Sequence, residues 1–271
     1  MPELPEVETT VRGLEPVLLG ERIARVELMR DGLRRPFPQD LVQRMVGARV
    51  IALTRRAKYG LIATDRDDVM IFHLGMSGRW RTDAADEQKH DHLRLLTGSG
   101  QWLALNDPRR FGSVDLVSGD AETNFVPFVT MGPEPLSDTF DAAVLAGALA
   151  GRAAPIKQLL LDQRIVAGLG NIYVCEALFI ARIAPTTAGG SIAKARLVRL
   201  VDAIKAVLDA AIAAGGSSLR DFVHPDGELG YFSHAWQVYG RDGDACRDCG
   251  QPILRIVQGG RSTFFCRACQ R

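Results

Sequence analysis

The sequence lacks long hydrophobic runs and an excess of charge of either sign. No apolar stretch approaches the ~18 residues of a membrane-spanning helix, and the N-terminus lacks the basic-then-apolar pattern of a secretion signal. A net charge of only +1 excludes a uniformly basic surface, so a polyanionic partner would have to meet local basic patches. We therefore expect a cytoplasmic protein with no membrane association. With 46% hydrophobic and 24% charged residues among 271, it should be globular and large enough for two domains.

Cysteine is also scarce, and four of the five cysteines form two closely spaced pairs in a C-x2-C-x16-C-x2-C pattern. In a chain without a secretion signal, this spacing predicts a zinc site rather than disulfides. Four thiolates give the closed tetrahedral geometry of structural zinc, which leaves no open position for a reacting water. The fifth cysteine, Cys175, is expected to be a buried and unreactive thiol. The predicted ligands of one structural Zn²⁺ are Cys246, Cys249, Cys266 and Cys269.

The chain changes from strand-like to helical patterns near its middle, which predicts an α+β fold. Apolar residues at helical spacing predict a helix near the N-terminus that Gly20 ends, and the short runs that follow predict a β-sandwich. The strand-like runs are 22–28, 48–54, 60–64, 69–74, 93–97 and 102–106, and the later helices are 141–149, 155–163, 171–182 and 193–214. The predicted divisions are a catalytic sandwich domain with flanking helices at 1–125, a linker with two turns at 126–140, a helical domain at 141–235 and a β-ribbon zinc finger at 236–271.

The first eight residues, MPELPEVE, carry a candidate nucleophile. Removal of Met1 would leave Pro2 with a secondary α-amine, and α-amino groups titrate near pH ~8, so a fraction is unprotonated at neutral pH. Such an amine attacks an electrophilic carbon to form an iminium, while Glu3 and Glu6 stand nearby for proton transfer. Pro5 and the acidic residues also match an ordinary helix start, and the residues alone favour this second interpretation.

MPELPEVE resembles the N-terminal signature of the formamidopyrimidine-DNA glycosylases, bacterial enzymes of base excision repair. The resemblance runs from residue 2 to residue 270 and implies that Pro2 is the nucleophile and Glu3 the catalytic acid. It implies a DNA glycosylase and abasic-site lyase for oxidised purines such as 8-oxoguanine and formamidopyrimidines, which cuts by β- and δ-elimination. The partner would be damaged double-stranded DNA, bound by a monomer in the bacterial cytoplasm at the nucleoid.

Two motifs in the first half of the chain match family positions near the lesion's phosphate. Lys58 lies in RRAKY, where the resemblance implies that it assists catalysis, although a loop lysine is by itself usually a solvated charge. His73 begins HLGMSG, where the resemblance implies a phosphate contact. The motif alone would favour a strand end with a core methionine.

The resemblance also implies a wedge that fills the space left by the extruded base. Enzymes that act on a base in duplex DNA must swing it out of the stack. Flexible, aromatic and planar cationic side chains suit the vacated position. The implied wedge residues are Met76, Arg109 and Phe111, with Arg109 facing the orphaned base.

The stretch KHDH at 89–92 allows two interpretations. Its spacing resembles a metal site, but neighbouring side chains in a strand more often point to opposite faces, which would separate the aspartate from its flanking histidines. The family resemblance implies instead that His90 meets a phosphate. Arg152 is a further DNA-binding candidate, because relatives carry a basic residue at that position.

The second half supplies two more candidates. Asn171 follows a Gly-x-Gly turn before a helix, where backbone N–H groups suit a phosphate, and the resemblance to the family's helix–two-turn–helix implies a phosphate contact. Arg261 follows Gly259-Gly260 in a predicted β-ribbon turn that would present a guanidinium to phosphate. The resemblance implies that Arg261 grips the extruded nucleotide and takes part in the second elimination. Residues 224–232 resemble the loop that closes over the damaged base.

Two rival functions differ from this interpretation. The endonuclease VIII branch prefers oxidised pyrimidines, but its members begin with a sequence similar to Pro-Glu-Gly-Pro-Glu. This chain has Leu4 where that sequence has glycine. A non-catalytic zinc-ribbon protein that binds DNA would be marked by loss of Pro2 or Glu3, and both are present. The net charge of +1 is low for a protein that clamps duplex DNA.

Overall fold

The computed structural model describes residues 2–217, 225 and 231–271, beginning with helix α1, Leu4–Leu18. Pro5 lies in the first turn, and Glu3 at the N-cap forms a reciprocal capping box with Glu6. Gly20 follows the helix in a left-handed conformation, at φ +81°. The predicted N-terminal helix is confirmed, and its buried apolar stripe consists of Val7, Val11, Leu14 and Leu18.

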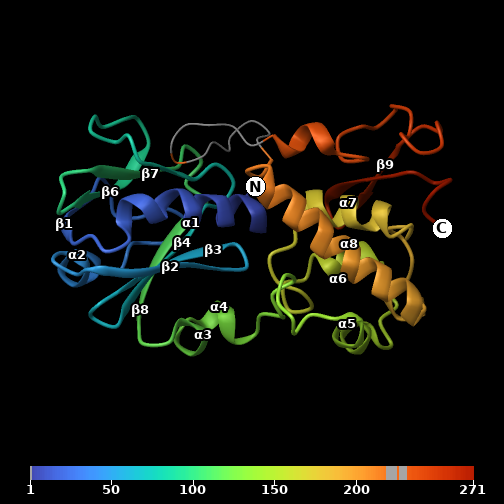
Figure 1. The fold of residues 1–271 in the computed structure, drawn as a ribbon, viewed down its shortest axis with the longest axis horizontal. Coiled ribbons are helices and arrows are strands. Elements are labelled where there is room, and N and C mark those ends of the chain that lie inside the picture. Colours follow the sequence, from blue (N-terminus) through green and yellow to red (C-terminus); the bar gives the residue numbers. More distant parts are fainter. Residues whose placement is uncertain (1, 218–224, 226–230) are drawn as a thin grey trace. The chain divides into compact units, whose positions relative to one another are not determined.

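Two four-stranded antiparallel sheets follow, in the orders β1-β6-β7-β5 and β2-β3-β4-β8 (Figure 1). Apolar side chains from both sheets and α1 form one buried core, which confirms the predicted sandwich. The strands are β1 Ile23–Leu28, β2 Val50–Arg56, β3 Tyr59–Thr64, β4 Asp68–His73, β5 Arg79–Arg81, β6 Asp91–Thr97, β7 Trp102–Asn106 and β8 Ser113–Ser118.

All six predicted strand-like runs are strands, but the sequence pattern missed two others. Strand β5 has only three residues, two of them arginines, and β8 mixes serine and aspartate with its apolar residues. One of the two turns predicted in the 126–140 linker was placed at Val126-Pro127. This prediction is wrong, because these residues begin the short helix α4, Val126–Val129, where a proline in the first turn is tolerated. Two other short helices are α2 Leu41–Met45 and α3 Ala121–Asn124.

The four later helices are confirmed with shorter bounds. They are α5 Ala142–Leu149, α6 Ile156–Leu160, α7 Asn171–Ile180 and α8 Lys194–Ala213, with 3-10 turns η1 Gly189–Ser191 and η2 Phe232–Ala235. None of the helices among the described residues is long and apolar enough to cross a membrane.

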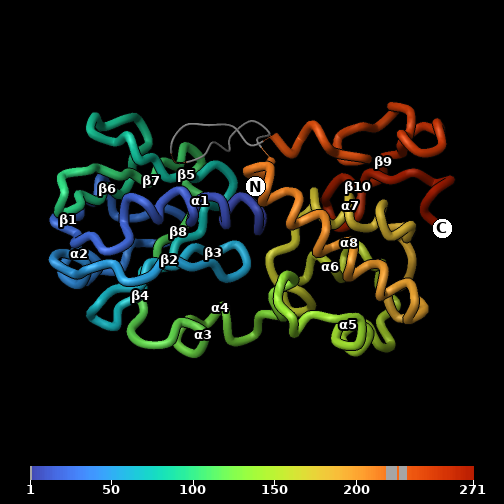
Figure 2. Tube along the Cα trace, in the orientation of Figure 1, coloured from blue at the N-terminus to red at the C-terminus, as the bar shows by residue number. Residues whose placement is uncertain are grey.

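The chain ends in a β-ribbon of β9, Leu254–Gln258, and β10, Arg261–Phe265. The two-residue turn between them is Gly259-Gly260, and both glycines have positive φ, as a tight hairpin turn of this kind requires. Strand β10 lies alongside α7 (Figure 2). Cys175 and Phe179 of α7 are buried against the ribbon, which confirms the predicted burial of Cys175.

Contacts divide the chain into two units. One comprises Met1–Val129 with Ile212–Ser233, and the other comprises Thr130–Ala211 with His234–Arg271. The predicted divisions at 1–125, 126–140, 141–235 and 236–271 stay predictions. The loop predicted at 224–232 lies outside the described residues except for its positions 225, 231 and 232.

Candidate active site

The N-terminal site is built on the start of α1. Pro2 is buried, and Glu3 and Glu6 are 3% and 2% exposed. One oxygen of Glu6, Oε2, accepts the Glu3 backbone N–H at 2.8 Å, while Oε1 accepts the Ser217 N–H at 2.8 Å. Both oxygens of Glu6 therefore hold backbone in place. Glu3 also holds backbone, since its side chain accepts the Glu6 N–H in the capping box, and it remains the candidate for proton transfer because it is adjacent to Pro2 in the chain.

Lys58 lies in the two-residue turn between β2 and β3, and it is largely buried. Its neighbour Ala57 has a φ of +52°, a left-handed conformation that is unfavourable for a residue with a Cβ. Arg55 ties this turn to α1, since its Nε donates to Glu8 at 2.9 Å and its Nη1 donates to the Ala57 carbonyl at 3.1 Å. The turn carrying Lys58 is thus anchored to the helix that begins beside Pro2.

His73 ends β4 and pairs with Tyr59 across the ladder, with 4.8 Å between the ring centroids. The Gly75 N–H donates to His73 Nδ1 at 3.0 Å, which places the ring proton on Nε2. Burial, and then the positive charge of Lys58, lowers the pKa of His73 to about 4. His73 is therefore a neutral Nε2–H donor at physiological pH.

The predicted wedge residues belong to two neighbouring segments. The Arg109 guanidinium lies 5.1 Å from the centre of the Phe111 ring, and Phe111 is 47% exposed. A Cβ on Gly75 would lie 2.3 Å from the Phe111 carbonyl carbon, so the segment before Met76 packs backbone to backbone against the Phe111 segment. Met76 itself is half-buried.

The KHDH stretch uses two of its residues for structure. Asp91 is buried and accepts from Arg81 Nη1 at 2.8 Å, and His92 Nε2 donates to the Asp107 carbonyl at 3.0 Å. His90 is half-buried with a φ of +77°, and its ring centroid lies 6.3 Å from that of His92. Two of the three side chains that could bind a metal in this stretch, Asp91 and His92, are therefore engaged in other contacts. The DNA contact of His90 stays a prediction.

The second unit holds the candidates Asn171 and Arg261. Asn171 starts α7, and its Nδ2 donates to the Ser262 carbonyl at 2.8 Å. Arg261 is exposed and precedes Ser262 at the start of β10. The structure thus links the Asn171 helix to the Arg261 turn. Arg152 is exposed in the turn after α5, where its carbonyl accepts the Gly190 N–H at 2.8 Å.

Three polar residues of this unit were not predicted: Lys157 and Glu176 are buried, and Gln163 is half-buried. Lys157 is fully buried and donates from Nζ to the Ser262 carbonyl at 3.1 Å and to Thr263 Oγ1 at 2.7 Å. Glu176 accepts three consecutive backbone N–H groups, those of residues 237–239, while burial raises its pKa. Gln163 accepts the Gly168 N–H at 2.9 Å and so supports the turn before α7. A lone charge in an apolar helix is a signal that could have revealed Lys157 and Glu176.

The four ribbon cysteines fit one zinc ion. Their Sγ atoms lie within 4.8 Å of one another, with 4.0 Å from Cys246 to Cys269 and 3.5 Å from Cys249 to Cys266. Four sulfurs at about 2.3 Å from a tetrahedral zinc lie about 3.8 Å apart. Desolvation and then the neighbouring sulfurs raise the pKa of Cys269 to about 12, so a nearby cation would be needed to keep this thiol deprotonated.

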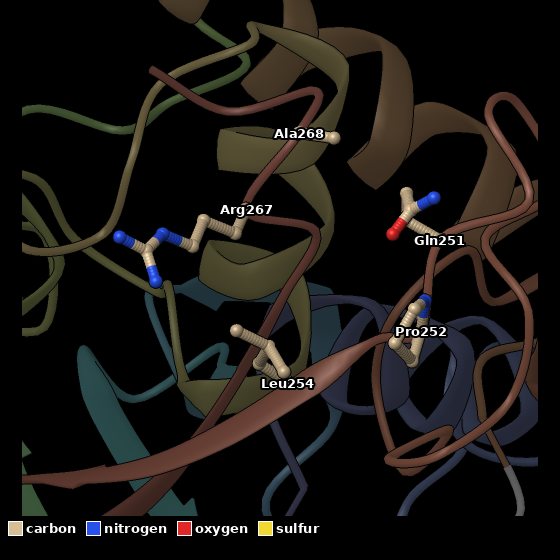
Figure 3. A pocket seen from close by; sticks show the side chains of 5 residues that line it. All are labelled: Gln251, Pro252, Leu254, Arg267 and Ala268. Carbon is tan, nitrogen blue, oxygen red and sulfur yellow. The ribbon is translucent and has the colours of Figure 1, made fainter.

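A pocket of about 350 Å³ on the ribbon is separate from these groups (Figure 3). In the close-up, the Arg267 side chain points away from Gln251 and Pro252. No predicted catalytic residue or zinc ligand is among the residues that line this pocket. Its lining residues are Gln251, Pro252, Leu254, Arg267 and Ala268.

Three family matches cover most of the chain. The formamidopyrimidine-DNA glycosylase N-terminal domain matches residues 1–114, the H2TH domain of the same enzymes matches residues 131–223, and the zinc finger found in FPG and IleRS matches residues 243–271. These matches have the same order as the sandwich, the helices and the ribbon.

Relatives and solved structures agree over the full length. The formamidopyrimidine-DNA glycosylase of Sphingopyxis alaskensis is 66% identical, with 100% of both chains covered. The crystal structure of the MutM (Fpg) protein from Thermus thermophilus has a TM-score of 0.90 at 39% identity, covering 99% of this chain and 98% of that one. A Lactococcus lactis Fpg mutant in complex with Fapy-dG containing DNA has a TM-score of 0.91 at 36% identity, with 100% of both chains covered. The chain described here therefore belongs to the formamidopyrimidine-DNA glycosylase family.

Proposed function

We propose that this chain excises oxidised purines, such as 8-oxoguanine and formamidopyrimidines, from duplex DNA and then cleaves the abasic site. Family membership supports DNA glycosylase and abasic-site lyase activity in base excision repair. The observation that carries the mechanism is the placement of Pro2 directly before α1, with Glu3 buried beside it and Glu6 committed to holding backbone.

The chemistry begins when Met1 is removed and the Pro2 amine attacks C1′ of the damaged nucleotide. The bond from C1′ to the base breaks, and the base leaves with the proton that the amine gives up. The C1′–O4′ bond then opens as O4′ takes a proton, and the Pro2 nitrogen becomes a cationic iminium. Glu3 supplies the carboxyl group for proton transfer at this step. Loss of a proton from C2′ then allows elimination at the 3′ side and afterwards at the 5′ side.

The remaining candidates bind and orient the DNA backbone. Lys58 and the neutral His73 offer donors from the first unit, and Asn171 and Arg261 offer donors from the second. Anchoring each donor in a turn or at a helix end reduces the conformational freedom that binding would otherwise remove. Local donors of this kind compensate for the low net charge of +1. His90 and Arg152 are proposed as further backbone contacts.

Met76, Arg109 and Phe111 form the proposed wedge, since Arg109 stacks on an exposed Phe111 and Met76 lies on the adjoining segment. The zinc ion would be held by the four ribbon cysteines and would stabilise the ribbon without taking part in the reaction. We propose that the enzyme acts as a monomer on damaged double-stranded DNA in the bacterial cytoplasm, at the nucleoid.

A panel of duplexes that each carry one lesion tests this function. The purified protein should cleave duplexes with 8-oxoguanine or formamidopyrimidine faster than those with an oxidised pyrimidine. The Glu3→Gln variant should lose base excision while remaining folded. Faster cleavage of oxidised pyrimidines would instead favour the specificity of the endonuclease VIII branch, and absence of cleavage would favour a DNA-binding protein without activity.

A further inference from the structure

Asp107 is a fully buried aspartate that joins the two segments carrying the proposed wedge. It is 0% exposed, its Oδ1 accepts the Ser77 hydroxyl at 2.6 Å, and its Oδ2 accepts the Gly112 N–H at 2.8 Å. Short hydrogen bonds to an ionised acceptor are stronger than neutral ones. One carboxylate therefore fixes the residue after Met76 and the residue after Phe111.

Ser77 completes the connection. Its hydroxyl donates to Asp107, and the same oxygen accepts the Arg109 backbone N–H at 3.1 Å. The Arg110 N–H donates to the Asp107 carbonyl at 3.2 Å, and Arg110 has a left-handed φ of +60°. Hydrogen bonds within the loop that carries Arg109 and Phe111 therefore hold it together, and two hydrogen bonds join it to Ser77.

We propose that Ser77 and Asp107 form a clasp that makes Met76, Arg109 and Phe111 act as one rigid wedge. The clasp rests on the proposed function, which assigns base replacement to those three side chains. Extruding a base breaks its stacking and pairing, so a side chain that can retreat from the vacated space loses much of its effect. The clasp prevents this retreat because displacing either segment would leave a buried carboxylate without its donors. Ser77 and Asp107 are therefore positioning residues for base extrusion and not catalytic residues.

A double-mutant cycle between Ser77→Ala and Phe111→Ala tests the clasp. The single-turnover rate is measured on a duplex containing 8-oxoguanine and on an abasic site in single-stranded DNA, where no base has to be replaced. Ser77→Ala should slow the duplex reaction about tenfold or more and leave the single-stranded reaction unchanged. Added to Phe111→Ala, it should cause no further loss, because the side chain that it positions is already absent.

A matched control is Ser118→Ala, which removes a hydroxyl that donates to Asp68 at 3.1 Å at the other end of β8 and should leave both rates unchanged. Asp107→Asn provides a second test, because it breaks one of the two carboxylate bonds while keeping the side-chain size. It should give the same loss on duplex DNA alone, with folding checked by circular dichroism.

Equal losses on both substrates, or a full further loss when Ser77→Ala is added to Phe111→Ala, would overturn the clasp while leaving the wedge intact. If Phe111→Ala itself left the duplex rate unchanged, the wedge assignment would fail and the clasp with it. The two failures are distinguishable, because the clasp is tested by the rates of the Ser77→Ala variants and the wedge is tested by the rate of Phe111→Ala alone.

Discussion

Replacing Glu6 by glutamine should damage the N-terminal site through its hydrogen bonds. Each Glu6 oxygen accepts one backbone N–H at 2.8 Å, from Glu3 and from Ser217, and the residue is 2% exposed. Glutamine keeps one accepting oxygen but turns an NH₂ group toward the other N–H. A hydrogen bond to a charged acceptor contributes about 1.5–3 kcal/mol, and the donor left without an acceptor remains buried. We expect Glu6→Gln to lower the free energy of unfolding by about 3 kcal/mol.

The same change should slow the chemistry more than it weakens DNA binding. A misplacement of about 1 Å at a reacting group can reduce a rate by about 100-fold, and the Glu3 backbone lies directly beside Pro2. Single-turnover cleavage of an 8-oxoguanine duplex measures the chemistry, a binding titration with the same duplex measures the affinity, and chemical denaturation measures the stability. Glu15→Gln is the control, because Glu15 is exposed on the same helix and should change stability by less than about 0.5 kcal/mol. Normal rate and stability in Glu6→Gln would refute the positioning role of Glu6.

Three further predictions concern other parts of the molecule. Chelation of zinc should unfold the ribbon and abolish DNA binding while the sandwich stays folded, because four thiolates bound to zinc supply the folding free energy of so small a module. A metal assay that finds no stoichiometric zinc in the purified protein would contradict this prediction. Because the pKa of His73 is lowered to about 4, the unfolded chain binds a proton at His73 below pH ~6.5 while the folded chain does not, so His73 reduces the stability of the fold as the pH falls from ~6.5 toward 4. NMR at pH 7 should show a neutral His73 ring with its proton on Nε2, and titration of His73 near pH ~6.5 would contradict this prediction. Lys157→Met should slow strand cleavage about tenfold or more at unchanged zinc content, because the Ser262 carbonyl beside Arg261 loses a hydrogen-bond donor. An unchanged rate would show that Lys157 does not position the Arg261 turn for the reaction.

Local patterns in the sequence predicted the features that depend on local spacing. The capped helix α1, the alternating strands and the paired cysteines each follow from residues that are close together in the chain. Strand β5 was missed because three residues with two arginines carry no alternation that a pattern could detect.

Long-range contacts could not be predicted in this way. Glu6 bonds to Ser217, and the buried Lys157 bonds to Ser262 and Thr263, across more than 100 positions in each case. The residues alone placed both Glu3 and Glu6 beside Pro2, and the family resemblance assigned the acid role to Glu3. The contact of Glu6 with Ser217 was not visible in the sequence. The return of Ile212–Ser233 to the first unit is likewise not marked by any change in composition.

The most direct test of the mechanism is the position at which the protein attaches to damaged DNA. Borohydride should reduce the iminium and trap the mature protein covalently, with the adduct at Pro2 in a peptide map. Pro2→Gly keeps a terminal amine and should retain weak trapping, whereas an uncleaved N-terminal extension should abolish it because the amine becomes an amide. Lys58→Ala should react more slowly but still be trapped. Attachment at Lys58, or undiminished trapping of the extended protein, would contradict the N-terminal mechanism.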